Sequence, residues 1–300
     1  MITLHKIIAK ILELFFSLWG HIPRKWAIRL GNILGKLWYF ADKRHRNVAL
    51  SNLNKVYGHE KSPDEIEKLA RQVFQNLAQI PLEICWSMRL GVNDFLSYCD
   101  VKGEANLKDA LKKGRGVLFF SAHIGNWEFL SFAFGRFGFP VSGIYRPIKS
   151  EPINMLTYNY RTRFGAKLIP KKHSMRKILK GLENNECVGM LLDQDPGSSA
   201  GLFADFFGVP VSTNKGLAQL ALKTGAPVIP AFVIRDGLRY QIEFGKEIPL
   251  IETSQREKDI VANTQQYNEV IEEVVRRYPE QWFWVHRRWK HSPSTSINKG

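Results

Sequence analysis

The sequence predicts an α/β fold, with a largely parallel central sheet flanked by helices and an N-terminal layer of amphipathic helices. From about residue 115, short apolar runs alternate with helical stretches, which is typical of repeated βαβ units. Residues 1–48 instead carry apolar side chains at helical spacing among basic ones. The 300 residues contain no internal repeat and no low-complexity linker. We therefore expect a membrane-associating helical segment at residues 1–48 and a single α/β unit at residues 49–300.

The composition excludes a disordered chain, because 44% of the residues are hydrophobic and 12% are aromatic. Lys and Arg number 43 against 28 acidic residues, which gives a formal net charge of +15. Such an excess suits nucleic acid, an anionic membrane surface or an acidic ligand. The three cysteines show no CxxC spacing, so neither a disulfide framework nor a zinc site is indicated.

The first twenty residues predict an amphipathic helix without the cleavage site of a signal peptide. Lys6, Lys10 and Glu13 lie off the densest part of its apolar stripe, whereas a spanning helix needs about 20 predominantly apolar residues. We therefore expect a helix lying in the headgroup region, and a covered core helix is the alternative. The stripe consists of Leu4, Ile7, Ile8, Ile11, Leu14, Phe15, Leu18 and Trp19.

Residues 22–50 mix basic and aromatic side chains, which suits an anionic bilayer interface and also single-stranded nucleic acid. No RNP-like, KH or helix-turn-helix signature supports nucleic acid, so we expect none as a partner. A further helix should begin at Ser62, where Pro63 and Glu65 complete a capping box, and Pro81 should kink or interrupt it.

The remainder reads as alternating strands and helices. Strands are expected at residues 116–122, 141–145, 166–170, 187–195, 226–234 and 239–245. Helices are expected at residues 174–185, 212–225 and 256–277.

Titratable side chains follow several of these strands. His123 follows the first, Arg146 comes at the end of the second, and Asp193 and Asp195 end the run at 187–195. Parallel sheets bind ligands at the carboxyl ends of their strands, so these residues form a candidate site.

His123 and Glu128 are five residues apart, which places them about 140° apart around a helix. They meet only if the chain bends, and Gly125 and Asn126 allow a bend. A carboxylate bonded to an imidazole orients it as a general base, and a purely structural His–Glu contact is the alternative. No GxSxG near His123, no GxGxxG after a strand, and no GxxxxGK[ST] or HExxH motif occurs. We therefore expect a His base without cofactor or metal, acting on a hydroxyl group.

Five segments together resemble one family, the late acyltransferases of lipid A biosynthesis, within the HxxxxD/E glycerolipid acyltransferases. They are "SAHIGNWE", "YRPIK", "RTRFGAKLIP", "LLDQDPG" and "YPEQWFWVHRRWK", in the family's order, and the match runs from about residue 5 to 291. The resemblance implies a glycerolipid-acyltransferase-like fold. It also implies transfer of a fatty acyl chain from acyl carrier protein to a hydroxyl of a lipid A precursor. The place implied is the cytoplasmic face of the bacterial inner membrane, held peripherally or by one N-terminal span.

The resemblance also implies residue roles. His123 matches the general base and Glu128 its orienting carboxylate, while Arg163, or its neighbour Arg161, matches an arginine block that could supply an oxyanion donor. Arg146 matches a block that could bind glycolipid phosphate.

The family's D-x-D block corresponds to Asp193 and Asp195, with Gln194 between them where relatives carry His or another residue. At the C-terminal end, Trp282 and Trp284 should be structural. Arg287, Arg288 and Lys290 should face phosphates or the membrane.

Two alternatives stay open. One is acylation of another glycolipid, such as a mannosylated phosphatidylinositol. The other is a non-enzymatic basic protein that binds membrane or nucleic acid, which gives no reason for titratable groups at several strand ends.

Overall fold

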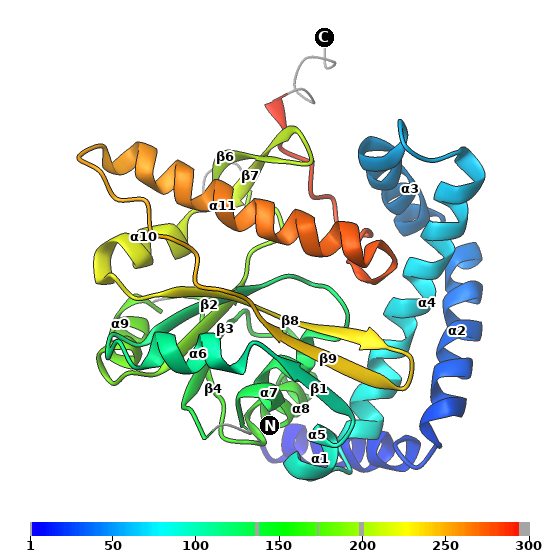
Figure 1. Cartoon of the computed structure of the whole chain (residues 1–300). Coiled ribbons are helices and arrows are strands. Elements are labelled where there is room, and N and C mark those ends of the chain that lie inside the picture. The colour runs from blue at the N-terminus through cyan, green and yellow to red at the C-terminus, as the bar shows by residue number, and fades with distance from the viewer. Residues whose placement is uncertain (1, 136–137, 173, 198–200, 294–300) are drawn as a thin grey trace.

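The computed structural model describes residues 2–135, 138–172, 174–197 and 201–293, and it confirms a largely parallel central sheet flanked by helices (Figure 1). Seven strands lie in the order β1-β9-β8-β2-β5-β3-β4. β9 is antiparallel to β8, and the other neighbouring pairs are parallel. The strands are β1 (Cys99–Lys102), β2 (Val117–Ser121), β3 (Val141–Tyr145), β4 (Lys167–Pro170), β5 (Cys187–Leu191), β8 (Val228–Asp236) and β9 (Arg239–Phe244).

The central strand β2 is buried on both faces, as expected for a parallel sheet covered by helices on both sides. Leu118 and Phe120 join the core formed with α9 (Met175–Glu183), α10 (Gly216–Thr224) and α11 (Arg256–Arg277). Val117 and Phe119 point the other way, into the core with α5 (Val92–Leu96), α6 (Glu104–Leu111) and α7 (Leu130–Gly135). Figure 1 shows α10 and α11 above the sheet and α6 and α7 below it.

The N-terminal part consists of α1 (Ile2–Trp19), α2 (Arg24–Ala41), α3 (Lys43–Tyr57) and the long α4 (Pro63–Ser87). The capping box at Ser62 and Glu65 is confirmed, since each residue's side chain accepts from the other's backbone N–H. The expected interruption at Pro81 is wrong, because α4 continues through it. Buried residues on both sides of Pro81, among them Ile80 and Glu83, hold the helix against its neighbours.

α2 packs closely on α4, and two glycines explain the approach. A Cβ at Gly35 would lie 2.4 Å from Cα of Gln75, and one at Gly31 would lie 2.7 Å from Cγ of Gln79. Only hydrogen fits at these two positions, so the α2 backbone can rest directly on α4. The domain boundary expected at residue 48 falls inside α3, which also packs on α4.

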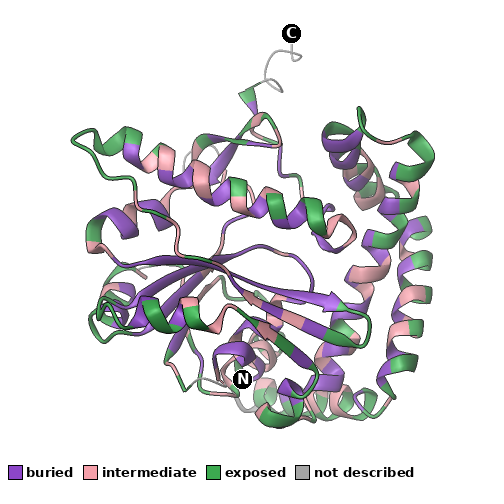
Figure 2. Cartoon of the chain, in the orientation of Figure 1, coloured by how far each residue is buried: buried purple, intermediate pink, exposed green. Residues whose placement is uncertain are grey.

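Many large apolar residues of α1 and α2 are exposed. Figure 2 shows exposed residues along both helices. Ile11 is 60% exposed, Leu14 63% and Leu37 61%. None of the helices in the described ranges has an apolar stretch long enough to cross a membrane.

Several regions differ from the sequence-based expectation. Residues 212–214 belong to β7 (Val209–Asn214), which forms a hairpin with β6 (Gly201–Phe206), so the helix expected from 212 begins at Gly216. The strand expected at 187–195 ends at Leu191, because the chain turns there to direct Asp193 toward His123. α8 (Glu151–Thr162) and β1 were not anticipated.

Candidate active site

A cavity of about 590 Å³ opens at the carboxyl ends of β2, β5 and β3, which are neighbours in the sheet. His123, Arg146 and Asp195 line it, as expected for residues that follow these strands. Glu128 and Arg161 also line it. Its apolar wall is formed by Phe119, Leu130, Ile144, Leu168, Met190 and Leu220, which suits a hydrocarbon chain.

The partner of His123 is Asp193, not Glu128. His123 Nδ1 lies 2.8 Å from Asp193 Oδ1, and the His123 backbone N–H donates to Asp193 Oδ2 at 2.9 Å. Asp193 comes from the turn after β5, the strand that pairs with β2, so strand order brings the two together. An ionised carboxylate only accepts hydrogen bonds, so Nδ1 carries a proton, and in the neutral imidazole Nε2 presents its lone pair.

Asp193 is ionised although its side chain is only 2% exposed. Burial alone would raise its pKa, but its interaction with His123 and the hydrogen bonds that it accepts lower the pKa below the ordinary value. One of these bonds comes from Trp282, whose indole N–H donates to Oδ2 at 2.8 Å. Trp282 is 2% exposed, which confirms its structural burial and adds a contact that the sequence did not reveal.

The ring of His123 packs with two aromatic side chains that also contact each other: Trp127 lies at 5.0 Å and Phe283 at 5.9 Å between ring centroids, and those two rings are 6.0 Å apart. Its Nε2 lies 3.3 Å from the side-chain Nε2 of Gln194, the residue between the two aspartates. With the lone pair on His123 Nε2, Gln194 is the donor in this long contact. A substrate hydroxyl could replace so weak a donor.

Glu128 binds Arg161 instead of His123. Arg161 Nε and Nη2 donate to the two carboxylate oxygens of Glu128 at 2.7 and 2.6 Å. The expected direct His123–Glu128 contact is therefore wrong, because the bend at Gly125 and Asn126 turns Glu128 toward α8. Burial would lower the pKa of Arg161, but Glu128 raises it above the ordinary value, so the guanidinium stays charged at the cavity wall.

Arg163 lies outside the cavity lining, so the structure does not support it as an oxyanion donor. Its guanidinium donates to the backbone carbonyls of Ser87 and Leu90 at 3.0 and 2.7 Å, where α4 ends. Arg163 thereby braces the turn that follows α4, in which the Ser87 carbonyl also accepts from the Leu90 N–H at 3.0 Å. Arg146, in contrast, is exposed in the cavity lining.

Asp195 anchors the C-terminal segment to the cavity. Its carboxylate accepts from the Gly197 N–H at 2.7 Å and pairs with His291 Nδ1 at 2.7 Å. Its backbone N–H donates to His286 Nε2, and burial lowers the pKa of His286, which keeps that nitrogen an acceptor. Both histidines were missed, although the sequence places them in the run that follows Trp284.

Arg288 does not face phosphates or the membrane, because it is 0% exposed. It donates to the Ser212 carbonyl and to the Thr213 hydroxyl, and burial lowers its pKa to about 10. Its role is to tie the C-terminal segment to β7.

Across the described ranges, no three or more His, Cys, Asp or Glu side chains gather to hold a metal ion.

Comparison with known proteins agrees with this geometry. The family model for the bacterial lipid A biosynthesis acyltransferase matches residues 3–291. The chain is 29% identical to the lipid A biosynthesis lauroyltransferase of Escherichia coli (strain K12), over 91% of this chain and 88% of that one. It is 27% identical to the palmitoleoyltransferase of the same organism, over 92% and 89%. It is also 25% identical to a phosphatidylinositol mannoside acyltransferase of Mycolicibacterium smegmatis, over 63% and 62%. The cavity at the strand ends, its histidine paired with a buried carboxylate and the match over nearly the whole chain lead to one conclusion: the chain belongs to the bacterial lipid A biosynthesis acyltransferase family and is an acyltransferase.

Proposed function

We propose that this acyltransferase moves a fatty acyl chain from the thioester of acyl carrier protein to a hydroxyl of a lipid A precursor, with His123 as the general base. The observation that carries the proposal is the bond from His123 Nδ1 to the buried Asp193, which leaves the Nε2 lone pair for the cavity side, where Gln194 makes only a long contact with it at 3.3 Å.

The reaction follows from this tautomer. His123 Nε2 takes the proton of the acceptor hydroxyl as the hydroxyl oxygen attacks the thioester carbonyl carbon. The tetrahedral intermediate collapses, and the C–S bond breaks. The leaving sulfur takes the proton back from His123, so an ester and a free carrier thiol result. Asp193 stabilises the imidazolium that exists between these two proton transfers.

Negative charge on the former carbonyl oxygen needs a donor. Arg161 is our candidate in place of Arg163, because it lines the cavity and because Glu128 fixes the orientation of its guanidinium group. Its Nη1 bonds to none of the residues that the structure describes, whereas Nε and Nη2 are used by Glu128. Arg146, exposed in the cavity lining, is suited to a phosphate of the glycolipid.

The acceptor is a lipid, so the cavity must meet a membrane surface. The exposed apolar side chains of α1 and α2 are suited to insertion among headgroups, and the basic side chains of residues 22–50 to anionic lipids. We propose peripheral attachment at the cytoplasmic face of the inner membrane through this layer.

The test is transfer by purified His123→Ala with lauroyl- and palmitoleoyl-loaded acyl carrier protein and a lipid A precursor. We expect turnover to fall roughly 10²- to 10⁴-fold, the usual contribution of a general base. The matched control is His59→Ala, at an exposed position after α3, which should keep wild-type turnover. Full activity in His123→Ala would refute the mechanism. If the wild-type enzyme transferred the acyl chain faster to a phosphatidylinositol mannoside than to the lipid A precursor, the proposed acceptor would be wrong.

A further inference from the structure

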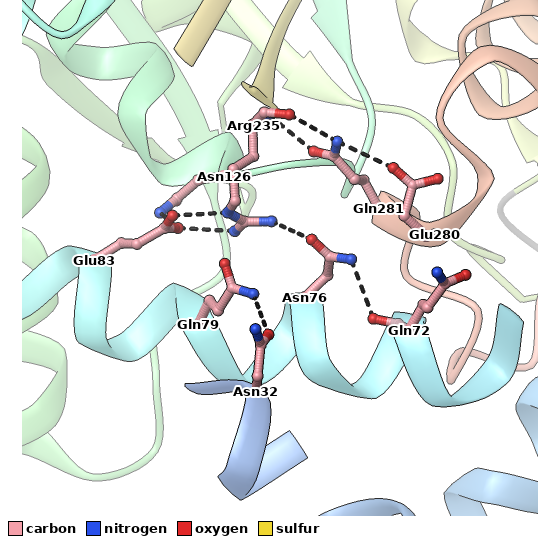
Figure 3. Close-up of polar contacts among 9 residues, drawn as sticks. All are labelled: Asn32, Gln72, Asn76, Gln79, Glu83, Asn126, Arg235, Glu280 and Gln281. Atoms are coloured by element: carbon pink, nitrogen blue, oxygen red, sulfur yellow. Dashed lines mark hydrogen bonds and ion pairs between the residues drawn. The ribbon is translucent and has the colours of Figure 1, made fainter. Parts of the chain in front are cut away.

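A buried ion pair lies beside the active-site loop. Glu83 of α4 and Arg235 of β8 have side chains that are 3% and 6% exposed. Arg235 Nε donates to Glu83 Oε1 at 2.7 Å, and Nη2 donates to Oε2 at 2.8 Å (Figure 3). Burial would raise the pKa of Glu83, but the Arg235 charge lowers it below the ordinary value, so both partners are ionised.

Such a pair contributes little net stability, because apolar side chains of similar size often do as well. The contacts around it give it a more specific use. Glu83 Oε2 also accepts the side-chain N–H of Asn126 at 2.8 Å, and Asn126 is 0% exposed. Asn126 lies within the loop that runs from His123 to Glu128.

The backbone of this loop is held from two more sides. The Asn126 N–H donates to the Val233 carbonyl of β8, and the Gly125 N–H donates to the Gln281 carbonyl, both at 3.1 Å. Gly125 has φ of +58°, and a Cβ there would lie 2.0 Å from the Val233 carbonyl oxygen, so the loop rests directly on β8.

Arg235 also holds the second of these anchors. Its backbone N–H donates to Gln281 Oε1, and its carbonyl accepts from Gln281 Nε2, both at 2.9 Å. Figure 3 shows Arg235 between Glu83 and Asn126 on one side and Gln281 on the other. The ion pair thus sits where α4, β8 and the loop meet.

We propose that Glu83, held by Arg235, is a positioning residue: through Asn126 it fixes the loop so that His123 and Glu128 keep their places in the cavity. This inference rests on the proposed function, since it concerns the placement of the proposed base. Glu83, Arg235 and Asn126 are absent from the cavity lining, so they act through the loop and not on the substrate.

The central test is Asn126→Ala, which cuts the side-chain link to the loop while leaving the two Glu83–Arg235 bonds in place. We expect kcat to fall about 10- to 100-fold, as a small misplacement of a catalytic group does, with KM for both substrates unchanged within about twofold. Glu83→Leu combined with Arg235→Met removes the same link from the other side and leaves no unpaired buried charge, so it should lower kcat similarly. Because both of these changes break the contact between Asn126 and residue 83, the double variant that combines them should lose no more than the worse of the two.

The matched control is Asp259→Asn, in α11. Asp259 is also a buried carboxylate, 3% exposed, and accepts two bonds from Thr253, away from the loop. The Asp259→Asn substitution should lower the Tm without changing kcat. Glu83→Gln is a second control: its amide oxygen still accepts from Asn126 in the place of Oε2, and only the bond from Arg235 Nε is lost, so kcat should stay near the wild-type value.

Wild-type kcat in folded Asn126→Ala, or losses that multiply in the double variant, would overturn the positioning role. The same assay separates this outcome from failure of the proposed function. Wild-type turnover in His123→Ala overturns the proposed base. An inactive His123→Ala beside a fully active Asn126→Ala overturns only the positioning role.

Discussion

Asp193→Asn should inactivate the enzyme by changing the tautomer of His123. Asp193 Oδ2 receives two donors, the His123 backbone N–H and the Trp282 indole, whereas Oδ1 receives only His123 Nδ1–H. The asparagine oxygen will therefore take the place of Oδ2, and its NH₂ group will face Nδ1. The imidazole can then accept at Nδ1 only by moving its proton to Nε2.

With its proton on Nε2, His123 cannot accept the proton of a hydroxyl. We expect kcat to fall about 10³- to 10⁴-fold, by analogy with the same substitution in other His–Asp pairs. That loss corresponds to about 4–5.4 kcal/mol of activation free energy. The folded state should lose less, about 1–3 kcal/mol, since two of the three hydrogen bonds keep an acceptor.

Single-turnover transfer from labelled acyl carrier protein measures this loss without interference from product release. Trp282→Phe is the control, because it removes one donor to Asp193 and leaves the tautomer unchanged, so kcat should stay within about tenfold of the wild type. If kcat of Asp193→Asn also stayed within about tenfold of the wild type, Asp193 would not be the group that sets the tautomer.

Three further predictions concern other parts of the molecule. The folded-state pKa of Asp193 is lowered, so its stabilisation is complete above the unfolded value of about 3.9 and is lost as pH falls through the folded pKa. Urea unfolding at a series of acidic pH values should show that the free energy of unfolding of Asp193→Asn falls less steeply with decreasing pH than that of the wild type. An equally steep fall would contradict this. Arg161→Ala should abolish transfer, whereas Arg163→Ala should cost about 1–3 kcal/mol of stability, because two hydrogen bonds to the turn after α4 are lost, at roughly normal kcat. The reverse result would restore Arg163 as the oxyanion donor. Replacing Ile11 and Leu14 by Ser should weaken binding to anionic vesicles in flotation assays, by up to about 1.5–3 kcal/mol for each side chain that inserts fully. Unchanged flotation would place the membrane contact elsewhere.

The sequence predicted which strand ends form the site, because apolar runs mark β2, β3 and β5 and parallel strands present their carboxyl ends at one edge. It did not predict which carboxylate binds His123. Local spacing suggested Glu128, but the partner depends on strand order, and β5 beside β2 brings Asp193 from 70 residues away.

The same limit applies to the arginines. Arg161 and Arg163 are two residues apart at the end of α8, and helical rotation turns one toward the cavity and the other toward the end of α4. Glu83 and Arg235 are 152 residues apart, and no local pattern pairs them. Hydrophobic periodicity predicts elements, whereas polar pairing is decided by how those elements pack.

The contacts of Trp282 and His291 have a consequence for biosynthesis. The carboxylates that they hold, Asp193 and Asp195, lie 89 and 96 residues earlier in the chain. On the ribosome, the sheet strands emerge well before these two residues, so a nascent chain can collapse its sheet while the site is still unfinished. Closure of such distant contacts is slow compared with helix formation. A premature stop codon just before residue 282 should therefore give a chain that retains much of its secondary structure but has no catalytic centre.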